Sequence, residues 1–152
     1  EGYKEMMEST TKLNSIGADL AKIKGVHAIT DVTGFGLMGH LIEICDGAGL
    51  QATVNWGDLP ILPSALVYAR KGYNTGAANR NWDSFGMRIK VPVAMEQWQK
   101  NLLADPQTSG GLLVTCPPDH ANKIIALFHE QGYPLAAKIG SMEAGLAQVT
   151  VV

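Results

Sequence analysis

Apolar and polar positions divide the chain into segments with helical periodicity and shorter, extended ones. Helical periodicity predicts helices over residues 3–24, 36–46, 63–71, 95–103 and 118–131. β-prone runs predict strands over residues 26–32, 50–56, 111–116, 136–141 and 146–151. Residues 72–92 are rich in Asn and Gly and lack a period, so we expect a long loop there. In this prediction helices alternate with strands, and a pair of strands closes the chain. Such an order is typical of an α+β fold, here a layered α/β/α domain with a mixed β-sheet.

One polar segment interrupts this pattern just before the strand at 111–116. Pro106 ends the preceding helix and moves Asp105 out of the helical conformation. Small polar side chains and two glycines follow, at Gln107, Thr108, Ser109, Gly110 and Gly111. Because a glycine lets the backbone approach another group closely, we expect Gly110 to leave room for a ligand. Such a loop on a core strand often carries function, and a tight connection without a ligand is an equal alternative on local chemistry.

A second polar turn joins the strand that ends at Val32 to helix 36–46. The first turn of a helix offers unpaired N–H groups and a positive dipole end, where phosphate oxygens bind. Asp31 would repel a bare phosphate but would tolerate one carried with Mg²⁺, which takes one or two carboxylates plus substrate phosphates. On local chemistry Asp31 could help to hold such a cation, or it could be a turn or cap residue, the commonest role of Asp between a strand and a helix. Thr33, Gly34 and Gly36 lie in the turn that follows it.

Residues 34–39 also spell G-x-G-x-x-G, and Asp58 follows about twenty residues later. This pattern is typical of a dinucleotide-binding Rossmann unit. Two features weaken that interpretation. Asp31 would place a negative charge beside a pyrophosphate, and the rest of the chain lacks the βαβ units that complete a doubly wound sheet.

Two further polar residues have both a functional and a structural interpretation. Arg80 lies between two asparagines. Its guanidinium could form bidentate hydrogen bonds to a phosphate, or it could hold the long loop in place by hydrogen bonds. His40 follows Gly36 by one helical turn, and we expect a hydrogen-bonded structural residue there rather than a metal ligand.

Composition narrows the function classes. The 152 residues fit one domain, and 46% hydrophobic with 17% charged residues favours a globular fold over disorder. A net charge of −2 provides no general attraction to nucleic acid or to anionic membranes, and no apolar run is as long as a membrane span. Cys45 and Cys116 are expected to be core thiols, and a reducing, cytoplasmic location is the default.

Three segments occur in a fixed order along the chain. Residues 31–41 read DVTGFGLMGHL, residues 79–86 read NRNWDSFG, and residues 104–113 read ADPQTSGGLL. They resemble motifs of the C-terminal domain of selenophosphate synthetases (selenide, water dikinases), in the aminoimidazole ribonucleotide synthetase-like superfamily. The family's G-G-T before the Arg-Asn pair is replaced here by Gly-Ala-Ala at residues 76–78.

The resemblance implies the fold and the chemistry of that family. The expected reaction makes selenophosphate, AMP and phosphate from selenide and ATP, with Mg²⁺ as the metal. Asp31 would help to hold Mg²⁺, with Thr33, Gly34 and Gly36 supporting it. The loop from Asp105 to Gly111 would contact the reacting groups as a substrate- or phosphate-binding loop. No catalytic residue is assigned within this chain.

The resemblance also implies a domain organisation. Residues 1–152 would form one C-terminal domain of a longer enzyme whose N-terminal ATP-binding domain is absent, so the chain alone would be inactive. The full-length protein would be a cytoplasmic homodimer that binds ATP and selenide, with no nucleic-acid or membrane partner. The alternatives are a domain of a related aminoimidazole ribonucleotide synthetase-like ATP enzyme and a non-catalytic interaction module of the same fold.

Overall fold

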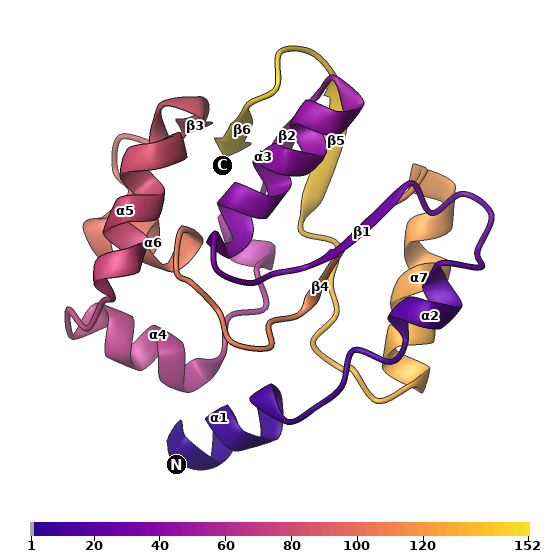
Figure 1. The fold of residues 1–152 in the computed structure, drawn as a ribbon, viewed down its shortest axis with the longest axis horizontal. Helices are drawn as coiled ribbons and strands as arrows, with labels where there is room; N and C mark the ends of the chain where they lie inside the picture. Colours follow the sequence, from indigo (N-terminus) through magenta and orange to yellow (C-terminus); the bar gives the residue numbers. More distant parts are fainter. Residues whose placement is uncertain (1) are drawn as a thin grey trace.

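The computed structural model describes residues 2–152. Their short strands form a mixed sheet and a smaller strand pair, and helices pack around them (Figure 1). The α-helices are α1 Gly2–Thr10, α2 Gly17–Leu20, α3 Gly36–Ala48, α4 Pro63–Arg70, α5 Gly76–Phe85, α6 Gln97–Leu103 and α7 Pro118–Glu130. The strands are β1 Ala28–Asp31, β2 Leu50–Val54, β3 Ile89–Lys90, β4 Leu112–Thr115, β5 Gly140–Ala144 and β6 Val149–Val151. The predicted helices that match α3, α4, α6 and α7 agree with these bounds within a few residues. None of the helices in residues 2–152 is long and apolar enough to cross a membrane.

The strands form two sheets. The larger has the order β3-β6-β2-β5, in which β2 is parallel to β6 and antiparallel to β5. This arrangement confirms the α+β class and the mixed sheet. Strands β1 and β4 form a separate antiparallel pair.

The closing strands β5 and β6 do not pair with each other as expected, because β2 lies between them. Strand β6 takes an interior position, where Val149 and Val151 are buried. Strand β5 reaches the other side of β2 through Gly140, where a Cβ would lie 1.9 Å from the carbonyl oxygen of Thr53. Burial of Val149 and Val151 therefore holds β6 in the interior of the sheet, and the close main-chain contact at Gly140 lets β5 pair on the other side of β2.

Two apolar clusters form the core. In the larger one, Met38, Leu41 and Ile42 of α3 pack with the inward-facing residues of β2 and β6. The smaller one joins Ile16 and Leu20 to Ile124 of α7, beside the β1–β4 pair. Helices α2 and α7 accordingly lie side by side in Figure 1.

The single helix predicted over residues 3–24 is wrong, because the chain leaves α1 after Thr10 and re-enters a short helix at Gly17. The hydroxyls of Thr10 and Thr11 donate to main-chain carbonyls four residues earlier, a contact that competes with regular helix continuation. Ile16 is fully buried in the smaller core cluster, whereas no residue of α1 is buried. Burial of Ile16 therefore determines the direction of the segment after the break.

The long loop predicted over residues 72–92 is also wrong, because most of it forms α5, a 3₁₀ turn and β3. Thr75 caps the helix by accepting a hydrogen bond from the main-chain N–H of Ala78, at 3.1 Å. Ala78 is buried, and Trp82 and Phe85 pack against the larger core cluster. These three residues have helical spacing, a signal hidden by the weak helix propensities of the residues between them.

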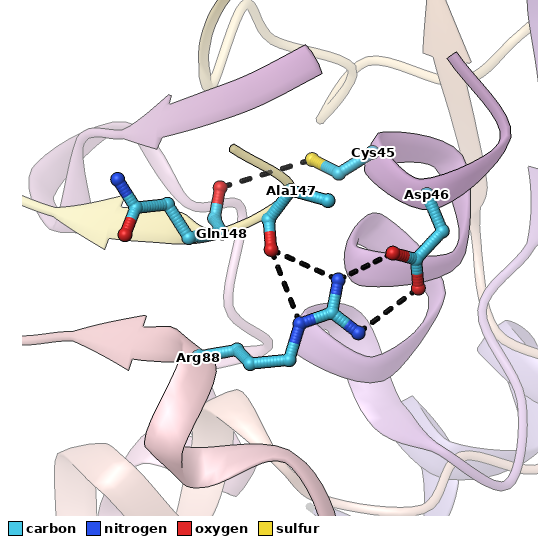
Figure 2. Close-up of polar contacts among 5 residues, drawn as sticks. All are labelled: Cys45, Asp46, Arg88, Ala147 and Gln148. Carbon is cyan, nitrogen blue, oxygen red and sulfur yellow. Dashed lines mark hydrogen bonds and ion pairs between the residues drawn. The ribbon is translucent and has the colours of Figure 1, made fainter. Parts of the chain in front are cut away.

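Arg88, in the 3₁₀ turn before β3, hydrogen-bonds to α3 and to the segment before β6 (Figure 2). Its guanidinium forms two hydrogen bonds with the carboxylate of Asp46, at 2.9 and 2.5 Å, and its Nε and Nη2 donate to the carbonyl of Ala147. The hydrogen bond from Arg88 holds the pKa of the Asp46 carboxyl below its usual value. Beside it, Cys45 is buried, and burial raises the pKa of its thiol, which confirms Cys45 as a core thiol. Cys116 is half-buried, and burial raises the pKa of its thiol too.

Candidate functional site

The β1–β4 pair places two of the three motifs side by side. Asp31 is the register partner of Leu112, so the turn after β1 and the loop before β4 leave the sheet at the same end. Two main-chain hydrogen bonds of 2.9 Å continue the pairing: Val32 donates to the carbonyl of Gly111, and Gln107 donates to that of Thr33. The two loops form one unit.

Two glycines allow this close contact. Gly36 has a φ of +68°, and a Cβ there would lie 2.7 Å from the carbonyl carbon of Ala104. A Cβ on Gly110 would lie 2.1 Å from the carbonyl oxygen of Val32. The expectation that Gly110 leaves room for a ligand is therefore wrong, because the end of β1 fills that space. Gly34 and Gly111 are different, since a Cβ there would meet no atom within 4 Å.

The third motif reaches both loops through Asn81 on α5. Its side-chain amide donates to the carbonyl of Gly34 at 2.8 Å and to that of Ala104 at 3.0 Å. A second asparagine, Asn14, donates to the carbonyl of Gly110 at 2.8 Å. Sequence reasoning assigned no role to either. The signal for Asn81 was its place inside the third motif, whereas nothing local marks Asn14.

His40 is buried and hydrogen-bonded at both ring nitrogens, which confirms the structural interpretation. Its Nε2 lies 3.0 Å from Oγ1 of Thr33, and its Nδ1 lies 2.8 Å from Oε2 of Glu43. Glu43 lies one helical turn further along α3 and was missed as a site residue. The ring thus connects the first polar turn to a carboxylate on the surface.

The candidate metal ligand, Asp31, is exposed at the end of β1. Within residues 2–152 there is no cluster of three or more His, Cys, Asp or Glu side chains that could hold a metal ion. Asp31 could therefore supply a single carboxylate to a hard cation, whose other ligands would be phosphates, water or a group from elsewhere.

The loop before β4 has a buried end and an exposed tip. Asp105 is half-buried, and burial raises the pKa of its carboxyl. It lines a pocket of about 240 Å³ together with residues that include Tyr68 and Asn101. Gln107, Thr108 and Ser109 are exposed, and Ser109 has a φ of 53°, in the left-handed region. The donors of the tip are thus accessible to a ligand.

Arg80 lies exposed on α5, the helix that also carries Asn81. Its guanidinium makes no hydrogen bond or ion pair with any other side chain or carbonyl in residues 2–152. The alternative in which Arg80 pins a long loop is therefore wrong, because the loop is a helix and Asn81 makes the contacts. The phosphate role of Arg80 stays a prediction.

The chain belongs to the family described as AIR synthase related protein, C-terminal domain, whose model matches residues 2–152. It is 49% identical over 150 residues to a selenide, water dikinase of Dechloromonas aromatica and 48% identical over 151 residues to one of Paraburkholderia xenovorans. Each match covers 99% of this chain and 43% of the relative, so the chain spans less than half of these proteins. The resemblance drawn from the three motifs is confirmed.

Solved structures of lower identity share the fold. The chain superposes on the hydrogenase maturation protein HypE of E. coli with a TM-score of 0.57 and 18% identity, over 98% of this chain and 40% of HypE. A thiamine-monophosphate kinase of Stenotrophomonas maltophilia gives a TM-score of 0.53 and 19% identity, over 84% and 31% of the two chains. These likenesses confirm the AIR synthase-like fold.

Proposed function

We propose that this chain is the C-terminal domain of an ATP-dependent selenophosphate synthetase, which makes selenophosphate, AMP and phosphate from selenide and ATP. One observation carries the proposal: three motifs far apart in sequence meet at one site, where Asn81 bonds to both polar loops. The relatives named selenide, water dikinase support this reaction. Their 49% and 48% identity favours it over the activities of structural neighbours that are 18–19% identical.

Within this proposal the domain forms one wall of a phosphoryl-transfer site. Mg²⁺ supplies charge neutralisation of the ATP phosphates when bound. Asp31 provides one carboxylate to it, and Thr33, Gly34 and Gly36 hold the turn that carries Asp31. The loop from Asp105 to Gly111, with its exposed tip from Gln107 to Ser109, offers hydrogen-bond donors to the transferred group, and Arg80 offers a bidentate donor to a phosphate.

The remaining parts of the site would come from outside this chain. A single carboxylate in residues 2–152 does not form a complete Mg²⁺ site, so we infer that an N-terminal ATP-binding domain supplies the other ligands. The complete enzyme is proposed to be a cytoplasmic homodimer. A structure of HypE in complex with ATP, with a TM-score of 0.59 to this chain, supports a nucleotide substrate for this fold.

The proposal can be tested with a chimera that joins the N-terminal part of the Dechloromonas aromatica relative to this chain. The chimera should form AMP in a selenide-dependent reaction, and this chain alone should not. A chimera that is folded by circular dichroism and binds ATP, yet forms no selenophosphate by phosphorus NMR, would contradict the proposed function. The intact relative, assayed in parallel, is the control for the assay.

A further inference from the structure

The hydroxyl of Thr33 is the inner end of a hydrogen-bonded chain that begins at the surface. Oε2 of Glu43 lies 2.8 Å from Nδ1 of His40, and Nε2 of His40 lies 3.0 Å from Oγ1 of Thr33. The Glu43 side chain is 58% exposed, whereas that of His40 is 10% exposed. Solvent therefore reaches the Glu43 carboxylate at one end of the hydrogen-bonded series, and protein encloses the His40 ring in its middle.

The direction of both hydrogen bonds follows from the chemistry of the end groups when Glu43 is ionised and His40 is neutral. An ionised carboxylate only accepts, so Nδ1 of His40 must carry the proton that lies between it and Glu43. In the neutral form of the imidazole one ring nitrogen donates and the other accepts, so Nε2 is the acceptor in that form. The hydroxyl of Thr33 therefore donates its single proton to the neutral form of His40.

We propose that Glu43 and His40 are positioning residues that orient the Thr33 hydroxyl, so that its oxygen presents only lone pairs to the phosphoryl-transfer site. This inference rests on the proposed function for the identity of that site. Lone pairs accept hydrogen bonds from the water shell of a divalent cation, and they repel an unprotonated phosphate oxygen. Thr33 then serves the hydrated cation beside Asp31, and phosphate oxygens are left to N–H donors elsewhere in the two loops.

The orientation can be tested on this chain without any ligand. Nitrogen-15 NMR of the imidazole rings should show His40 with a protonated Nδ1 and an unprotonated Nε2. His129 is the matched control, because its Nε2 donates to the carbonyl of Ala136 and should carry the proton. Glu43→Ala should abolish the strict Nδ1–H form of His40 and leave His129 unchanged. A protonated Nε2 on His40 in the unsubstituted chain would overturn the inference.

The consequence for the cation can be tested in the chimera described above. Thr33→Val should raise the Mg²⁺ concentration for half-maximal activity by roughly three- to tenfold, the range for one hydrogen bond. The KM for ATP at saturating Mg²⁺ should stay unchanged, and Thr33→Ser should restore the Mg²⁺ dependence. A raised KM for ATP with an unchanged Mg²⁺ requirement would show that Thr33 donates to phosphate, and no change in either would also contradict the inference. An inactive chimera would count against the proposed function alone, since the NMR measurement decides the orientation independently.

Discussion

Gly110 lies so close to Val32 that a Cβ on the glycine would be 2.1 Å from the carbonyl oxygen of the valine. The obstacle is main chain at the end of β1, which cannot rotate away as a side chain would. The next residue, Gly111, accepts a hydrogen bond from the N–H of Val32 and has open space where its Cβ would be. Two adjacent glycines of one motif therefore have different functions: Gly110 permits the contact between the loops, and Gly111 faces free space.

Gly110→Ala should destabilise this chain by about 1–3 kcal/mol, because the added methyl forces the two loops apart. Gly111→Ala is the matched control and should change the free energy of unfolding by less than about 0.5 kcal/mol. Urea unfolding of the two variants, followed by tryptophan fluorescence, measures the difference. Equal free energies of unfolding would mean that the loops accommodate the methyl group without a loss of stability. The interpretation of Gly110 as a residue that leaves room for a ligand would then stand.

Asn81→Ala should destabilise the chain by about 1–3 kcal/mol, because it removes two hydrogen bonds that join α5 to the two loops. The buried Ala104 would keep a carbonyl without its partner. The control is Asn79→Ala on the same helix, which removes one exposed side-chain hydrogen bond, to Asn74. Hydrogen exchange should increase at the Gln107 amide in Asn81→Ala and stay unchanged in Asn79→Ala. Unchanged exchange in both variants would contradict the role of Asn81 as a link between loops.

Local patterns predicted the elements whose packing agrees with their own periodicity. Helix α3 is an example, since its apolar face at Met38, Leu41 and Ile42 is both the sequence signal and the core surface. The two polar turns at one end of the β1–β4 pair were also marked locally, by Asp31 and by the Gly-Gly step. Their contact with each other follows from strand pairing, which no local pattern encodes.

The failures arose where distant contacts decide the conformation. Residues 72–92 have weak helix propensity, and α5 forms because its apolar face packs on the core and Asn81 bonds to both loops. The break after Thr10 places Ile16 in a cluster with Ile124, more than a hundred positions away. Asn14 was missed because its partner, the carbonyl of Gly110, comes near only in the folded chain. Glu43 lies one helical turn from His40, so its spacing on the predicted helix was a local signal that went unused.

Stability at acidic pH should depend on the Arg88–Asp46 pair. The hydrogen bond from Arg88 lowers the pKa of the Asp46 carboxyl in the folded state relative to about 3.9 in the unfolded chain. The contribution of the pair is therefore present above the unfolded-state pKa and is lost as the pH falls through the lower, folded-state value. Asp46→Asn should remove this part of the pH dependence, as measured by thermal melts between neutral and strongly acidic pH.

The control for this prediction is Asp83→Asn, which neutralises an exposed carboxylate on α5. It should leave the acid limb of the stability curve unchanged. If both variants and the unsubstituted chain lose stability in parallel on acidification, the loss belongs to other carboxylates, and Arg88 contributes only its packing and its hydrogen bonds to Ala147.

Asp31→Asn should lower the activity of the chimera by at least roughly a hundredfold, because an amide keeps the size of the carboxylate but removes the charge that a hard cation requires. The melting temperature of this chain should barely move, since Asp31 is exposed and its carboxylate makes no hydrogen bond or ion pair within residues 2–152. Glu130→Gln, at the exposed end of α7, is the control for a lost surface charge. Activity should be compared over a range of Mg²⁺ concentrations. Near-normal activity of Asp31→Asn at limiting Mg²⁺ would show that Asp31 is a turn residue and that the metal ligands lie outside this chain.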